Sequence, residues 1–176
     1  VGVCGKNEEV AKIQDLLIFV TKGLATVSNE GRKVGVIDKR VDRYITENLF
    51  VTITNANFDF KAIENRVKET LVLREELKKK VQAAGGNPVG DDFHGCATWT
   101  ATTEEEMMEK ASSVGVLSTE NEDIRSLREL IVYGLKGMSA YMKHAMNLGY
   151  NNEDIHGFMA KALVQTLNDS LTADEL

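Results

Sequence analysis

Residues 13–24 read IQDLLIFVTKGL, and residues 127–138 read LRELIVYGLKGM. In both segments apolar residues recur every three or four positions, which is the spacing of one face of an amphipathic α-helix. The same offset of 114 residues, applied without a gap, aligns residues 13–60 with residues 127–174. The chain is therefore predicted to contain two copies of one helical unit. The identities are few, so a chance similarity is the alternative.

Within the repeat, a lysine-glycine pair falls on a second lysine-glycine pair, Lys22-Gly23 on Lys136-Gly137. Each pair lies in the middle of a predicted helix. Glycine in a helix interior costs about 1 kcal/mol relative to alanine, so a compensating reason is expected. We expect a neighbouring element to approach closely at both Gly23 and Gly137.

The first unit is predicted to form three helices with short connections. Asn7 can cap the first helix, whose apolar stripe runs over residues 10–27. A second stripe covers residues 41–53, and Asp59 can cap a third helix that ends before Gly85. Three antiparallel helices with short connections make a bundle.

The second unit begins with a capping box of Thr119 and Glu122, ahead of a long helix over residues 124–145. Asn151 or Asn152 can start the next helix, whose stripe covers residues 155–167. A further box, Thr172 with Glu175, has almost no chain after it. The second unit is therefore expected to lack its last helix.

Together these patterns predict an all-α fold of two related three-helix bundles joined by an irregular linker. The first bundle spans residues 1–86 and the truncated second bundle spans residues 119–176. The linker, residues 87–118, carries a short helix that begins with the capping box of Thr103 and Glu106. Bare apolar faces on the second bundle are expected to be hidden by self-association, or by this short helix packing into the gap.

The composition supports a globular helical protein. Of the 176 residues, 43% are apolar and 27% are charged, with one proline and 14 glycines. A net charge of −6 argues against nucleic acid or an acidic membrane surface as a partner. No apolar run reaches the roughly 20 residues of a membrane span, and no signal peptide is recognised, so a cytoplasmic location is expected. The chain starts at Val1 and ends in an apolar pattern at Leu176, so both ends are interpreted as cut.

Cys4 is the first candidate for a chemical role. It stands just ahead of a predicted helix N-terminus, where backbone N–H groups and the helix dipole favour a thiolate. The second cysteine, Cys96, is too distant in sequence to suggest a disulfide framework. On spacing alone Cys4 is better interpreted as a small apolar residue near a frayed end, because one thiolate makes no metal site.

His94 and Cys96 could offer two soft metal ligands from one loop, but no third cysteine or histidine lies nearby in the sequence. An ordinary loop is the better interpretation. His144 is more simply a partner for the C-terminal dipole of the long helix. We find no phosphate-binding glycine loop and no nucleophile elbow.

Glu153 and His156 form a Glu-x-x-His pair, the spacing that di-iron carboxylate bundles use to place both side chains on one helix face. Such sites need two copies of the pair. The repeat places Lys39 and Asp42 at the corresponding positions, so the pair is not duplicated. Solvated charges at a helix start are therefore the preferred interpretation.

Several longer strings carry a family resemblance. The chain resembles the hybrid-cluster proteins, also called prismane proteins or hydroxylamine reductases, along essentially all of its length. The strings are VCGKNEE (residues 3–9), IQDLLI (13–18), TITNANFD (52–59), ATWT (97–100), TENEDIRSLREL (119–130) and GLKG (134–137).

The resemblance implies an iron-sulfur oxidoreductase that reduces hydroxylamine to ammonia, with an N-terminal domain of two three-helix bundles. In this family a 4Fe-4S cluster is held by four cysteines near the N-terminus, and the last of them is followed by Gly-Lys. Cys4, followed by Gly5 and Lys6, matches that last ligand. The resemblance places the other three cysteines ahead of Val1. It places the ligands of the second, iron-sulfur-oxygen hybrid cluster beyond Leu176.

The expected function is thus that of the electron-transfer-cluster domain of a hydroxylamine reductase. Cys4 is the one cofactor and metal ligand predicted in this chain, and no catalytic residue is predicted. The isolated chain is expected to bind no cluster and to be inactive. Its expected partners are the remainder of its own polypeptide and a redox donor protein. The rival hypothesis is a non-enzymatic helical scaffold that binds a partner.

Overall fold

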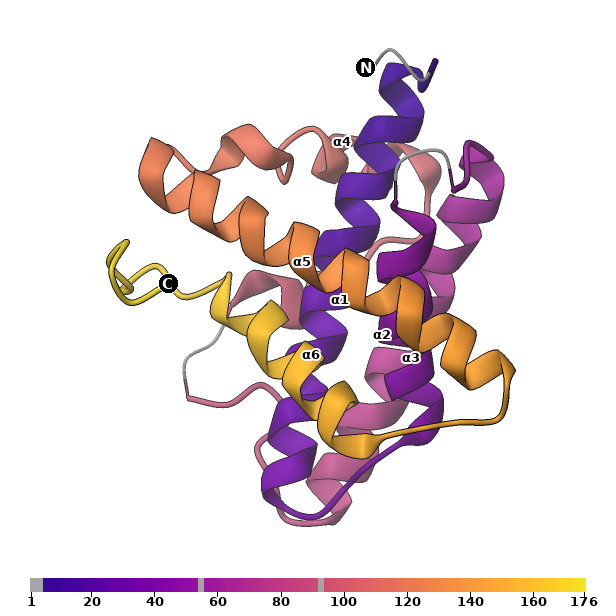
Figure 1. Ribbon diagram of the computed structural model, residues 1–176, viewed down its shortest axis with the longest axis vertical. Coiled ribbons are helices and arrows are strands. Elements are labelled where there is room, and N and C mark those ends of the chain that lie inside the picture. The colour runs from indigo at the N-terminus through magenta and orange to yellow at the C-terminus, as the bar shows by residue number, and fades with distance from the viewer. Residues whose placement is uncertain (1–4, 54–55, 92–93) are drawn as a thin grey trace.

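A computed structural model describes residues 5–53, 56–91 and 94–176, and this part of the chain is helical without any strand (Figure 1). The six α-helices are α1 (Glu8–Lys33), α2 (Lys39–Val51), α3 (Phe60–Ala83), α4 (Glu104–Ala111), α5 (Glu122–Asn147) and α6 (Glu153–Gln165). Two short 3-10 turns are η1 (Gly95–Ala97) and η2 (Val116–Ser118). The all-α prediction is confirmed.

Most helices begin at the capping residues that the sequence indicated. The Asn7 carboxamide oxygen accepts from the Val10 N–H at 2.8 Å at the start of α1. Asp59 caps α3 in the same way. The capping box of Thr103 and Glu106 is complete at the start of α4, since each side chain accepts from the other residue's backbone N–H.

The cap of α5 differs from the prediction. Asn121, and not Thr119, caps this helix, and its side chain accepts from the Ile124 N–H at 3.0 Å. Thr119 instead ends η2 in an extended conformation. The predicted box of Thr119 with Glu122 is therefore wrong. Because η2 occupies residues 116–118 and Thr119 follows it, the helix is capped two residues later than predicted, at Asn121.

The repeat is present in the helix boundaries. Helices α1 and α5 are each 26 residues long, α2 and α6 are each 13, and both pairs of boundaries differ by the 114 residues found in the sequence. Gly35 and Gly149 follow the first helix of each unit with left-handed φ angles of 77° and 87°. Matching lengths and matching turns make the repeat structural, and the chance alternative falls away.

Helix α1 lies at the centre of the packing. It contacts α2, α3, α4, α6 and η1, while α2 contacts α5 (Figure 1). The two units therefore pack reciprocally, since the first helix of each contacts the second helix of the other. One buried apolar cluster contains Leu24 of α1, Leu77 of α3, Leu135 of α5 and Leu163 of α6. Helices from both units thus share a core.

The short helix α4 covers α1 and does not fill a gap on α5. Its buried residues Met107 and Ala111 join a second cluster with Ile13 and Leu17 of α1. The suggestion that this helix packs into the second unit is therefore wrong. Both of its buried side chains lie on one face, and that face is taken up by α1.

Gly23 and Gly137 differ although the repeat aligns them. A Cβ atom on Gly23 would lie 2.0 Å from the carbonyl oxygen of Cys96, so the backbone of η1 rests directly on α1. That carbonyl also accepts from Nη1 of the buried Arg74 at 2.8 Å. A Cβ on Gly137 would meet nothing within 4 Å. The expected close approach is confirmed at Gly23 and is wrong at Gly137.

Helices α1 and α5 also differ in how many of their residues are buried. Fifteen residues of α1 are buried but only four of α5. Leu130, Tyr133 and Tyr141 are 65%, 77% and 83% exposed, although their repeat counterparts in α1 are buried. We call these three residues the α5 stripe. The face that α3 and η1 cover on α1 has no cover on α5 within the described residues.

The last residues of the second unit, 172–176, are joined by hydrogen bonds within the segment. The Leu176 N–H donates to the Thr172 carbonyl at 3.3 Å, and the Glu175 carboxylate accepts from the Thr172 N–H at 2.9 Å. Only one half of the predicted box forms, because the Thr172 hydroxyl donates to the Glu175 carboxylate and does not accept from the Glu175 N–H. Residues 173–175 form a turn and no helix. Among the described helices, none has the length and apolarity needed to cross a membrane.

Substituting the two repeat-related glycines by alanine should have opposite effects. Gly23→Ala is expected to lower the free energy of unfolding by about 1–3 kcal/mol, because the new methyl group forces the η1 backbone away from α1. Gly137→Ala, the matched control, should raise it by up to about 1 kcal/mol through helix propensity. Urea unfolding of both variants measures the difference, and equal effects would contradict the close contact at Gly23.

Hydrogen exchange should show the second unit to be the less protected one. Amides of α5 are expected to exchange faster than those of α1, because far fewer residues of α5 are buried. Exchange should be measured at several protein concentrations, since self-association through the α5 stripe would slow exchange in α5 only. Equal protection of the two helices in the monomer would show that the exposed stripe does not weaken α5.

Candidate functional site

The segment that follows Cys4 is tied to the rest of the fold. Cys4 itself lies outside the described residues. Gly5 has a left-handed φ of 83°, which an L side chain rarely adopts. The Lys6 ammonium donates to the side-chain carbonyl of Gln14, and the Gln14 amide donates to the Asn57 carbonyl at 2.9 Å. Residues 5 and 6 are thereby linked to α1 and to the turn ahead of α3.

The start of α1 also has a definite electrostatic character. The first N–H groups of an α-helix lack partners inside the helix and carry the positive end of its dipole. Asn7 satisfies one of these groups at Val10. A thiolate just ahead of a helix N-terminus is favoured by the remaining ones.

Cys96 does not suit a ligand role. It is fully buried in η1, and burial raises the pKa of its thiol to about 12, so the thiolate that binds iron or zinc is strongly disfavoured. Within the ranges that the structure describes, no three His, Cys, Asp or Glu side chains are grouped so as to hold a metal ion. The described residues on their own therefore do not fit an iron-sulfur cluster.

His94 has a structural role next to Cys96. Its Nδ1 accepts from the Cys96 N–H at 3.1 Å and so caps η1. Its ring meets the Phe19 ring edge to face, with the centroids 6.2 Å apart. Burial lowers the pKa of His94, so the neutral ring is favoured. The pair His94 and Cys96 thus shapes a turn.

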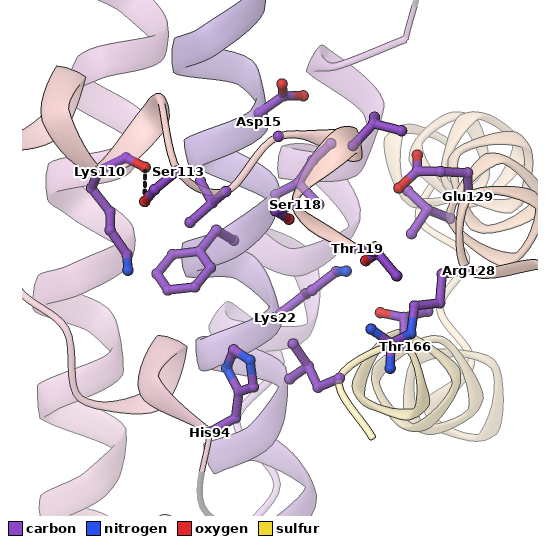
Figure 2. Close-up of a pocket in the computed structure, with 17 residues that line it drawn as sticks. Asp15, Lys22, His94, Lys110, Ser113, Ser118, Thr119, Arg128, Glu129 and Thr166 are labelled. Atoms are coloured by element: carbon purple, nitrogen blue, oxygen red, sulfur yellow. Dashed lines mark hydrogen bonds between the residues drawn. The ribbon is translucent and has the colours of Figure 1, made fainter. Parts of the chain in front are cut away.

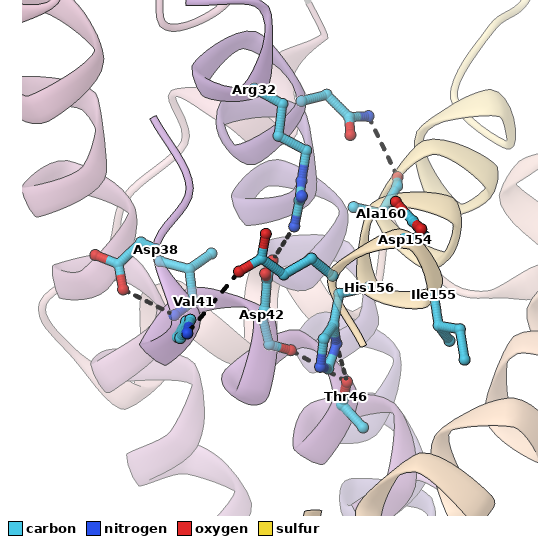
Figure 3. Close-up of polar contacts among 12 residues, drawn as sticks. Arg32, Asp38, Val41, Asp42, Thr46, Asp154, Ile155, His156 and Ala160 are labelled. Atoms are coloured by element: carbon cyan, nitrogen blue, oxygen red, sulfur yellow. Dashed lines mark hydrogen bonds and ion pairs between the residues drawn. The ribbon is translucent and has the colours of Figure 1, made fainter. Parts of the chain in front are cut away.

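Glu153 and His156 have different surroundings, and Figure 3 shows those of His156. Glu153 is exposed, and its carboxylate lies 3.9 Å from the Lys39 ammonium. His156 is only 3% exposed and packs toward Thr46 of α2. The interpretation of both as solvated charges is wrong for His156, because the reciprocal packing of α6 on α1 and α2 buries its side of the helix.

The surroundings of His156 are polar but closed. Its Nδ1 lies 3.2 Å from the Thr46 hydroxyl and its Nε2 lies 2.7 Å from the Asn151 side-chain oxygen. Nearby, the buried Asp42 accepts from Arg32 at 2.6 Å (Figure 3). Burial lowers the pKa of His156, although Asp42 acts in the opposite direction.

Two carboxylates and two lysines meet between α1 and α5. Asp15 and Lys22 come from α1, and their repeat counterparts Glu129 and Lys136 come from α5. Burial raises the pKa of Asp15 to about 6 against the attraction of Lys136. Burial lowers the pKa of both lysines. The charge of Glu129 favours the charged form of Lys22, and the charge of Asp15 favours the charged form of Lys136. We call these four residues the interface quartet.

A pocket of about 280 Å³ opens beside the interface quartet (Figure 2). Its polar lining includes three quartet members together with Arg128, Lys110 and His94. None of the sequence motifs described above predicted this site. The signal was present, since the repeat aligns a carboxylate seven residues ahead of a lysine in both units. That the two pairs face each other depends on how the units pack.

Comparison with known proteins places the chain among longer relatives. Residues 1–176 match the Prismane/CO dehydrogenase family. The chain is 78% identical to a hydroxylamine reductase of Clostridium perfringens, over 99% of this chain and 32% of that protein. It is 61% identical to hydroxylamine reductase 2 of Clostridium acetobutylicum and 51% identical to a hydroxylamine reductase of Clostridium tetani, again over 99% of this chain. The chain spans about a third of the length of these relatives.

The buried His156 should make stability depend on pH. Its pKa is lowered in the folded chain, so the unfolded chain takes up the proton first as the pH falls below about 6.5. The contribution of the neutral His156 ring to the free energy of unfolding is therefore complete above that pH. It decreases as the pH falls, by up to about 1.4 kcal/mol per pH unit.

Urea unfolding between pH 7.5 and pH 5 tests this expectation. His156→Gln should be less stable than the parent at pH 7.5 but should show a shallower decline toward pH 5. His144→Gln is the matched control, because His144 is exposed at the end of α5. If the His156 variant declines as steeply as the parent, the buried ring is not the source of the pH dependence.

Proposed function

The chain belongs to the Prismane/CO dehydrogenase family, and from this membership we propose that it is the N-terminal, electron-transfer region of an iron-sulfur hydroxylamine reductase. The observation that carries the proposal is 78% identity over nearly the whole chain to a protein named hydroxylamine reductase. Because the chain spans a third of that relative, the reductase activity is proposed for the longer protein. The 176-residue chain alone is not expected to be catalytic.

In this proposal Cys4 is a thiolate ligand of a 4Fe-4S cluster. The remaining three cysteines lie in parts of the longer protein that this chain does not span, as do the ligands of the hybrid cluster. The cluster supplies one-electron transfer when it is bound.

The described residues contribute positioning. The left-handed Gly5 turns the chain between position 4 and α1. Lys6 and Gln14 then connect this turn to the Asn57 carbonyl. Such a connection fixes a ligand-bearing segment against two helices, which limits the rearrangement that a cluster undergoes when it changes charge.

The remaining parts of the proposal concern location and partners. A redox donor protein passes electrons to the cluster, and the rest of the polypeptide packs on this helical region, with the α5 stripe as one contact surface. We place the protein in the cytoplasm, where thiols stay reduced and exposed clusters persist. The net charge of −6 disfavours nucleic acid as a partner.

Iron and acid-labile sulfide assays on the full-length protein test the assignment of Cys4. Cys4→Ser should lose about four iron atoms per chain and the matching sulfide, because a cubane needs about four protein ligands. It should also lose hydroxylamine-dependent oxidation of a reduced viologen dye. The 176-residue chain, assayed alone, should contain no stoichiometric iron.

Cys96→Ala is the matched control, since Cys96 is buried and its thiol is protonated. It should keep the iron and sulfide content of the parent. Unchanged iron in Cys4→Ser would reject Cys4 as a ligand. A full-length protein that contains no iron would reject the reductase and favour the helical scaffold.

A further inference from the structure

The interface quartet is symmetric in sequence but not in its hydrogen bonds. The Lys136 ammonium donates to the Thr52 carbonyl at 3.4 Å. Lys22 occupies the corresponding position on α1, where the repeat counterpart of Thr52 is Thr166. The Lys22 ammonium makes no hydrogen bond or ion pair among the described residues, and Lys22 lines the 280 Å³ pocket (Figure 2). A half-buried ammonium without an acceptor is costly unless something from solution supplies one.

Further cationic groups converge on the same pocket from other elements. Arg128 reaches it from α5 and Lys110 from α4, while His94 closes one side (Figure 2). Burial and the charges of Lys22, Lys110 and Arg128 disfavour protonation of His94. The charge of Asp169 acts in the opposite direction. The Nε of Arg128 is buried without a hydrogen-bond partner within the described part of the chain.

The acidic groups near the pocket form an ion pair with Arg128 but none with Lys22 among the described residues. Arg128 already pairs with Asp169 at 2.9 Å through its Nη2. Asp15 lies beside the backbone of Gly115 and forms no ion pair with Lys22 among the described residues. Glu129 is the remaining carboxylate, and it favours the charged form of Lys22 without forming an ion pair with it among the described residues.

We propose that this pocket binds a small oxoanion of the phosphate or sulfate class, with Lys22 and Arg128 as its cationic contacts. The hydroxyl of Thr119 lines the same part of the pocket and supplies a neutral donor (Figure 2). An oxoanion gives the Lys22 ammonium the acceptor that Thr52 gives Lys136. The site is separate from the Cys4 segment, and its proposal does not depend on the reductase function.

Isothermal titration of the 176-residue chain with inorganic phosphate and with sulfate, in chloride buffer of constant ionic strength near pH 7.5, tests the proposal. One anion should bind per chain with a saturable curve. Lys22→Met should weaken binding at least tenfold, since it removes the charge and keeps the chain length. Lys136→Met is the matched control and should leave binding within twofold, because Lys136 is held by Thr52 on the other side of the interface.

Thr119→Val provides a second variant that changes no charge and should weaken binding about three- to tenfold. Glycerol 3-phosphate separates the two sources of the anion, because tighter binding than inorganic phosphate indicates a phosphorylated metabolite and weaker binding indicates the free ion. Circular dichroism confirms that each variant is folded. Absence of saturable binding up to about 10 mM, or equal weakening by Lys22→Met and Lys136→Met, would overturn the site.

Discussion

The burial of α1 on nearly all sides is the constraint on which the rest of this structure depends. Fifteen of its 26 residues are buried, and α2, α3, α4, α6 and η1 all pack against it. Each large aliphatic side chain contributes roughly 1.5–3 kcal/mol when it leaves water. At one point even a methyl group is too large, since Gly23 receives the Cys96 carbonyl directly. The position of η1, and with it His94 and the pocket, follows from that contact.

The internal repeat explains how the two units pack together. Because α1 contacts α6 and α2 contacts α5, equivalent residues of the two units meet near the interface. A charge in one unit then faces the opposite charge of the other, as Asp15 faces Lys136 and Glu129 faces Lys22. Buried opposite charges stabilise only when each is well bonded, and otherwise leave polar groups available to a ligand. Here Lys136 donates a hydrogen bond to the Thr52 carbonyl, whereas Lys22 lines a pocket.

The first helices of the two units, α1 and α5, differ in which elements cover their apolar faces. On α1 the apolar face lies under α3 and η1, whereas the corresponding face of α5 exposes Leu130, Tyr133 and Tyr141. An exposed aromatic stripe of this kind is typical of a surface that packs against further protein. The relatives are about three times as long as this chain. In the proposed function, this stripe contacts the rest of such a longer polypeptide.

The sequence by itself determined the helices, their repeat and the family. Apolar spacing and capping residues such as Asn7 and Asp59 are local signals, because a helix satisfies its backbone hydrogen bonds within one segment. The string that begins at Cys4 pointed to a cofactor that no packing argument could suggest. Only the tertiary structure decided that His156 is buried, that Gly137 is open while Gly23 is filled, and that the interface quartet gathers beside a pocket. These outcomes depend on which helices, distant in sequence, pack against each other. The spacing of apolar residues identifies the buried face of a helix but does not indicate which element packs against that face.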